Sequence, residues 1–111
     1  MGLKANFTIQ GEISLTSQLE AGLYRIAQEA LNNVLKHAHA GNVSITLAQD
    51  AQSIYMEIAD DGVGFDPLQE REAGCLGLRN IQERAQELGI TLEILSQVGK
   101  GTKIILKRLL P

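Results

Sequence analysis

The chain of 111 residues has little of several residue types: one cysteine, no tryptophan, two prolines, two tyrosines and two phenylalanines. The single cysteine, Cys75, can form neither an internal disulfide nor a cysteine zinc cluster, so a reducing, cytoplasmic environment is expected. So few aromatic side chains argue against a stacking platform for single-stranded nucleic acid. The formal net charge of −3 argues against a duplex-binding protein, which usually carries a basic stripe. Nucleic acid is therefore not an expected partner.

Long hydrophobic runs are missing as well. The longest, such as Ile104–Leu106, are far too short to span a bilayer, and no apolar signal-peptide segment opens the chain. What is present is an ordinary globular balance of 44% hydrophobic and 21% charged residues. No repeat, low-complexity tract or linker interrupts the sequence, so residues 1–111 are expected to form one domain.

The first third of the chain is predicted to form an edge strand and a long amphipathic helix. Asn6–Ile13 is predicted as the strand, with a turn or bulge at Gly11. Ser17 can cap the helix, with Glu20 completing a capping box, and Gly41 can end it. The apolar residues of this helix recur at three- and four-residue steps over about five turns, and they are Leu19, Leu23, Ile26, Ala27, Ala30, Leu31, Val34 and Ala38.

Alternating apolar and polar residues predict two strand hairpins around a second helix in the rest of the chain. In order, the expected elements are strands at 43–48 and 54–59 with the turn Asp50–Ser53, a loop over Asp61–Gly74, a helix over Leu78–Leu88 stopped by Gly89, and strands at Thr91–Ser96 and Thr102–Lys107. This order predicts an α+β fold, a two-layer α/β sandwich with the helices on one face of a mixed sheet.

The predicted first helix carries a polar stripe beside its apolar face. Glu29, Asn33, Lys36 and His37 stand at i, i+4, i+7 and i+8, which places them on one side of an α-helix. An amide oxygen can bind Mg²⁺ and a lysine can bind phosphate, so the stripe can hold a metal-bound polyphosphate. The alternative is a solvated helix face with a Glu–Lys pair.

A carboxylate and two glycines follow the second strand of the first hairpin. Asp60 continues the inward parity of Ile54, Met56 and Ile58, and a buried carboxylate requires a hydrogen-bond donor such as the amino group of a purine. Alternatively, Asp60 caps its own turn through backbone amides. The glycines of Asp61–Phe65 permit close approach of a ligand, or they form a flexible turn. Neither a dinucleotide fingerprint nor a Walker loop is present.

Two further segments bear on phosphate and base binding. Gly74, Gly77 and Leu78 open the second helix, whose free N–H groups favour an anion, although glycines before a helix are also ordinary loop residues. Gly99–Thr102 is a hairpin turn in which Thr102 shares the inward parity of the strand that follows.

Together these segments resemble the catalytic domain of sensor histidine kinases of the nitrate-sensor type, in the GHKL superfamily. Gln28–Ala38 resembles their N box, and Asp60–Phe65 is similar to their G1 box. Leu76–Ala85 resembles the G2 box with its following helix, and Gly99–Thr102 matches the closing G-x-G-T. The four motifs keep the family's order and spacing over roughly residues 19–106.

The resemblance implies the Bergerat ATPase fold, with ATP and Mg²⁺ as ligands. It implies a water-activating position for Glu29, a role taken from related ATPases that would be a side reaction in a kinase. The other implied roles are Mg²⁺ coordination by Asn33, phosphate contacts by Lys36, His37, Gly77 and Leu78, and adenine contacts by Asp60, Gly62, Gly64 and Thr102.

The activity implied is that of a two-component histidine kinase, presenting the γ-phosphate of Mg-ATP to a histidine on a separate dimerisation domain. That helical domain is absent here, so the chain is expected to be an excised, monomeric fragment that binds ATP without autophosphorylating. The implied partner of the parent kinase is a response regulator, and such parents are commonly anchored in a membrane.

Two other functions stay open for the same fold. One is an anti-sigma-factor-type serine kinase or switch protein. The other is a degenerate ATP-binding module that serves only in interactions, an alternative raised by Cys75, which stands where the G2 box has its first glycine. The pattern of Glu29–Asn33 and Leu76–Ile81 favours the histidine kinase over the serine kinase.

Overall fold

A computed structural model describes residues 3–69 and 77–110 of the chain. Residues 70–74 at the end of the predicted 61–74 loop, Gly74 among them, and Cys75 and Leu76 of the G2 box lie outside the described residues. The elements that carry the fold are β1 (Lys4–Gln10), α1 (Ser17–Asn33) with the π-helical turn η1 (Val34–Ala38), β2 (Asn42–Gln49), β3 (Ser53–Asp60), α3 (Leu78–Glu87), β4 (Thr91–Ser96) and β5 (Thr102–Leu109).

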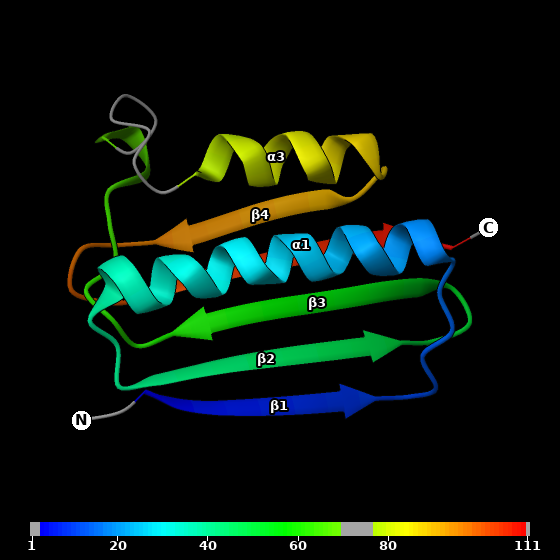
Figure 1. Cartoon of the computed structure of the whole chain (residues 1–111), viewed down its shortest axis with the longest axis horizontal. Coiled ribbons are helices and arrows are strands. Elements are labelled where there is room, and N and C mark those ends of the chain that lie inside the picture. Colours follow the sequence, from blue (N-terminus) through cyan, green and yellow to red (C-terminus); the bar gives the residue numbers. More distant parts are fainter. Residues whose placement is uncertain (1–2, 70–76, 111) are drawn as a thin grey trace.

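The strands form one five-stranded sheet in the order β1-β2-β3-β5-β4. β1 runs parallel to β2, and the other neighbouring strands are antiparallel. The helices α1 and α3 lie on the same face of this sheet (Figure 1). The predicted α+β sandwich with a mixed sheet is therefore confirmed, and both predicted hairpins are present.

The start of α1 differs from the prediction by one residue. Thr16, rather than Ser17, is the N-cap: its backbone is extended, and its side-chain oxygen accepts the N–H of Leu19 at 3.2 Å. With Thr16 as cap, the third helical position belongs to Leu19, so Glu20 cannot complete a capping box. Ser and Thr are both favoured N-cap residues, so the sequence alone does not decide between them.

Other boundaries shift slightly. β1 begins at Lys4 and ends before Gly11, which has a positive φ of 82° and packs against the carbonyl of Gln49, so the predicted extension to Ile13 is wrong. α3 ends at Glu87, and Gly89 follows it with a φ of 68°, as expected of a helix stop. β5 continues two residues beyond its predicted end, to Leu109.

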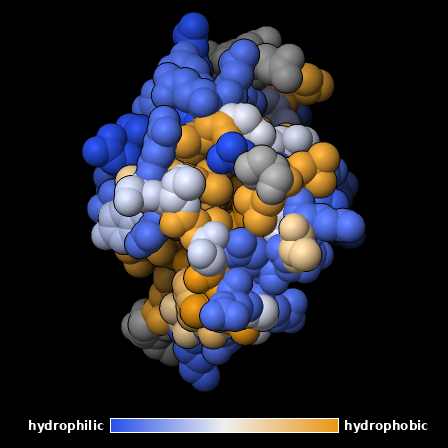
Figure 2. All heavy atoms as spheres, turned by 90° about the vertical axis from the view of Figure 1, so that its right-hand side faces the viewer, coloured by the Kyte–Doolittle hydropathy of each residue, from blue (hydrophilic) through white to orange (hydrophobic). Residues whose placement is uncertain are grey.

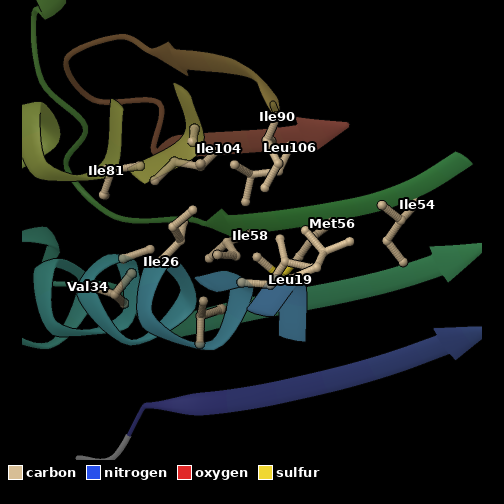
Figure 3. Close-up of a cluster of buried hydrophobic side chains, with 14 residues drawn as sticks. Leu19, Ile26, Val34, Ile54, Met56, Ile58, Ile81, Ile90, Ile104 and Leu106 are labelled. Atoms are coloured by element: carbon tan, nitrogen blue, oxygen red, sulfur yellow. The ribbon is translucent and has the colours of Figure 1, made fainter. Parts of the chain in front are cut away.

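The core lies between the sheet and the helices. Ile26 of α1 and Ile81 of α3 are both 0% exposed, and the buried stripe of α1 packs on alternate residues of β3 and β5. At the end of the sandwich away from Asp60, apolar side chains reach the surface in a strip flanked by hydrophilic residues (Figure 2). Figure 3 shows side chains from both layers pointing toward one another, among them Ile26, Ile58 and Ile104.

The inward alternation of β3 determines which way its last residue, Asp60, faces. Ile54, Met56 and Ile58 are buried, whereas Tyr55 and Glu57 between them are half-buried on the other face, where the Tyr55 hydroxyl donates to Glu57 at 3.0 Å. Asp60 is the next residue on the core side, at the strand end. Along the part of the chain that the structure describes, no helix is long and apolar enough to cross a membrane.

Candidate functional site

A small cavity lies where β3 and η1 end and where α3 and β5 begin. Its volume is about 50 Å³. The predicted site residues that line it are Asn33, His37, Asp60, Gly64, Leu78 and Thr102. Ala38, Phe65 and Ile104 complete the wall. Residues from four separate segments thus meet around one space.

Asp60 is the charged group of this cavity. Burial raises its pKa above the ordinary value of 3.8, while the amides of Gly62 and Thr102 oppose that shift. Its Oδ1 accepts the N–H of Gly62 at 2.8 Å, so Asp60 does cap its own turn, as the alternative interpretation held. It lines the cavity as well, so the two interpretations are compatible.

The two glycines after Asp60 are required by close backbone contacts within the protein. A β-carbon at Gly62 would collide with the carbonyl of Ala38, and the next N–H, that of Val63, donates to this same carbonyl at 2.7 Å. Gly64 has a φ of 64° and packs against the carbonyls of Gln97 and Gly101. The loop is therefore held against η1 on one side and the β4–β5 hairpin on the other, and Gly62 shapes the site without lining the cavity.

Thr102 belongs to a hydroxyl pair that sequence analysis missed. Its Oγ1 lies 2.8 Å from Oγ of Ser96, and Ser96 also donates to the carbonyl of Gly101 and accepts the N–H of Phe65. Ser96 pairs with Thr102 across the β4–β5 hairpin and shares its inward face. The register of that hairpin is the signal that could have identified Ser96.

The polar stripe predicted for the first helix is interrupted near the C-terminus of that helix. The helix changes from α to π after Asn33, and His39 then takes a left-handed φ of 50°, so the prediction of one α-helix ended by Gly41 is wrong. His37 lines the cavity with Asn33, whereas the side chain of Lys36 is exposed and takes no part in the lining. The wider π turn changes which side chains follow Asn33 on the inner side.

Glu29 and Gly77 lie together beside the cavity. Gly77 precedes α3 with a left-handed φ of 64°, and a β-carbon there would collide with Oε1 of Glu29. Glu29 therefore stands close to the N-terminus of α3, where N–H groups favour negative charge. No ion pair between Glu29 and Lys36 occurs among the described residues, so the simple Glu–Lys surface pair is not observed.

A larger, open cavity of about 540 Å³ shares Asp60 and Thr102 with the small one. Its lining includes the cations Lys100 and Lys103, together with Pro67 and Leu95. Within the described ranges, no three His, Cys, Asp or Glu side chains gather to hold a metal ion. A metal at this site would therefore need ligands from a bound molecule in addition to an amide such as that of Asn33.

Comparison with known proteins identifies what this arrangement resembles. Residues 18–111 match the family described as histidine kinase-, DNA gyrase B-, and HSP90-like ATPase. Sensor histidine kinase YhcY of Bacillus subtilis (strain 168) is 38% identical over 109 residues, which cover 96% of this chain and 28% of YhcY. Sensor histidine kinase LiaS of the same organism is 35% identical over 96 residues, 86% of this chain and 26% of LiaS. The chain thus spans about a quarter of the length of these relatives.

Solved structures show the same fold. The Acinetobacter baumannii histidine kinase AdeS aligns with a TM-score of 0.78 and 17% identity, over 96% of this chain and 54% of that one. The histidine kinase domain of the Erythrobacter litoralis EL346 blue-light activated histidine kinase aligns with a TM-score of 0.74 and 22% identity, over 95% and 50% of the two chains.

Proposed function

The chain belongs to the family of histidine kinase-, DNA gyrase B- and HSP90-like ATPases, and we propose that it is the ATP-binding catalytic domain of a two-component sensor histidine kinase. In this proposal it binds Mg-ATP and presents the γ-phosphate to a histidine on a separate dimerisation domain. The observation that carries the proposal is the half-buried carboxylate of Asp60, which lines a cavity together with Thr102, Asn33 and His37.

The adenine end of the proposed site is formed by Asp60 and Thr102. A carboxylate in an apolar wall is a strong acceptor for the amino group of adenine, because charge-assisted hydrogen bonds gain strength away from water. Thr102 and Ser96 hold a hydroxyl pair beside it, and Gly62 and Gly64 bring the loop close enough to shape the pocket. Since a cavity of about 50 Å³ has room for one or two waters only, the base has to displace side chains on entry.

The phosphate end of the proposed site is formed by α1, η1 and the start of α3. Bound Mg²⁺ would neutralise charge on the polyphosphate and fix its orientation. Asn33 would supply an amide oxygen to the metal, and Lys36 and His37 would contact phosphate oxygens. Gly77 and Leu78 would present backbone N–H groups at the N-terminus of α3.

Glu29 is the proposed catalytic carboxylate. Its Oε1 lies where a β-carbon on Gly77 would stand, next to the N-terminus of α3 and on the side where phosphates would lie. In a kinase, the task of such a group is to orient the acceptor or a water, and positioning supplies most of the rate in phosphoryl transfer.

The proposed setting is a cytoplasmic domain of a larger kinase. Its partners would be ATP, the dimerisation domain that carries the acceptor histidine, and a response regulator reached through the full-length protein. The domain itself would be a monomer. Both relatives bear the name sensor histidine kinase, which supports this assignment over the serine-kinase alternative.

Replacing Asn33 tests the proposed metal position. We expect Asn33→Ala to weaken ATP binding in the presence of Mg²⁺ by about tenfold, which corresponds to the loss of roughly 1.4 kcal/mol when the amide oxygen no longer binds the metal. Metal-free ATP binding should change much less. Isothermal titration calorimetry with Mg²⁺ and with EDTA measures both affinities. Asn32→Ala, an exposed amide on the same helix, is the matched control. Equal losses with and without Mg²⁺ would mean that Asn33 has a structural role instead.

A further inference from the structure

Asp61 joins two segments that are distant in sequence. Its Oδ1 accepts the N–H groups of Gly41 and Asn42, both at 2.9 Å, and its Oδ2 accepts the side-chain amide of Asn42 at 2.8 Å. The backbone N–H of Asp61 also donates to the carbonyl of Asn42 at 3.2 Å. One exposed carboxylate thus uses both oxygens to hold the turn that precedes β2.

That turn determines where η1 ends. Residues 39–41 connect η1 to β2, and His39 has a left-handed φ of 50°, a conformation that is unfavourable for a side chain other than glycine. Such a backbone persists only when its surroundings fix it. The bonds from Gly41 and Asn42 to Asp61 supply that fixation two and three residues after His39.

The same junction connects the two walls of the cavity. Asn33 and His37 come from the α1–η1 helix, and Asp60 comes from β3. Beyond Asp61, the Val63 N–H donates to the Ala38 carbonyl at 2.7 Å, in a contact that Gly62 permits. Two attachments therefore set the distance between the helical wall and the strand wall.

We propose that Asp61 is a positioning residue for the nucleotide site, which locks the end of η1 to the loop after β3 so that His37 and Asn33 face Asp60. That the site binds a nucleotide rests on the proposed function. Hydrogen bonds from Asn42 lower the pKa of Asp61, so the carboxylate stays ionised at neutral pH and accepts from all three donors. An asparagine at this position would offer one oxygen only, and its NH₂ group would oppose the donors.

The chain offers a matched control. Asp50 is also exposed, and its Oδ1 also accepts two backbone N–H groups, those of Gln52 and Ser53, both at 2.8 Å. It caps the β2–β3 turn at the opposite end of β3 from Asp60. Asp50→Ala therefore removes the same kind of bonds without touching the junction between η1 and the loop.

The first measurement needs no ligand. Amide hydrogen exchange by NMR on the whole chain is expected to show faster exchange at Val63 in Asp61→Ala, together with a shift of the His37 ring resonances, and neither change in Asp50→Ala. Exchange rates are compared after correction for each variant's global stability. Unchanged Val63 exchange and His37 resonances in Asp61→Ala would overturn the proposal.

The second measurement uses Mg-ATP. Calorimetric titration well below the melting temperature is expected to give about tenfold weaker binding for Asp61→Ala, an intermediate loss for Asp61→Asn, and wild-type affinity for Asp50→Ala. Equal affinities of the two alanine variants would show that Asp61 only stabilises the fold, contrary to the proposal. If the wild-type chain bound no ATP, the proposed function would fail, and the hydrogen-exchange result would still decide the role of Asp61.

Discussion

Asp60→Asn is expected to weaken ATP binding by roughly 10- to 150-fold, which corresponds to about 1.5–3 kcal/mol for a charge-assisted hydrogen bond. The reason is the position of Asp60 on the inward side of β3 at its end, where partial burial raises the pKa of its carboxyl group. An asparagine oxygen is a weaker acceptor for an adenine amino group, and its NH₂ group opposes that donor. Titration calorimetry on the two chains measures the difference.

The fold of this variant is expected to survive. An asparagine oxygen can still accept the Gly62 N–H that Asp60 accepts now. Because the native state holds the Asp60 proton more tightly than the unfolded chain, the free energy of unfolding falls as the pH rises from 3.8 through the raised pKa. The asparagine variant has no group that ionises at this position, so its free energy of unfolding does not fall over this pH range. Its melting temperature at pH 7 should therefore equal or exceed that of the wild type.

The same carboxylate predicts the pH dependence of binding. As the pH falls, Asp60 is protonated at a pH above 3.8, and ATP affinity should decline through that range in the wild type but not in Asp60→Asn. Asp50→Asn, at the other end of the same hairpin, is the matched control and should bind like the wild type. Wild-type affinity in Asp60→Asn would refute the assignment of Asp60 to the adenine.

Incubation of the isolated chain with γ-labelled ATP is expected to yield bound nucleotide and no phosphohistidine. His37 and His39 are the chain's two histidines; His37 lines the cavity from the proposed phosphate side, and His39 lies in the turn beyond η1. In-line transfer needs an acceptor nitrogen about 3–3.5 Å from the phosphorus, opposite the leaving oxygen. A residue fixed on the wall that binds the phosphates cannot reach that position.

Transfer should appear when a helical-hairpin domain that carries an acceptor histidine is added in trans, at a rate limited by docking. The same domain with its histidine replaced by alanine is the control. Acid-labile, base-stable label on the isolated chain would identify His37 or His39 as an acceptor and would contradict this division of roles.

Features that depend on the local periodicity of apolar residues and on single turn residues were predictable from the sequence. Sheet side chains alternate with a period of two, so the buried Ile54, Met56 and Ile58 determined which way Asp60 faces. The end of α3 shortly before Gly89 and the position of Thr102 at the start of β5 followed from similarly local patterns.

Features that depend on contacts between distant segments were not predictable. The hydrophobic pattern of Val34 and Ala38 fits one more α-helical turn as well as it fits a π turn, and it is the Val63 N–H that occupies the Ala38 carbonyl. As a result, His37 lines the cavity and Lys36 does not. The bonds of Asp61 to Gly41 and Asn42 join residues about twenty positions apart, with no sequence signal.

If this chain alone forms a complete ATP-binding site, calorimetric titration of the wild-type chain with ATP in excess Mg²⁺ will show saturable binding of one nucleotide per chain. The melting temperature will rise to match, and Asp60→Asn will lose most of that affinity. Absence of both binding heat and a melting shift at millimolar ATP would contradict a complete ATP-binding site in this chain.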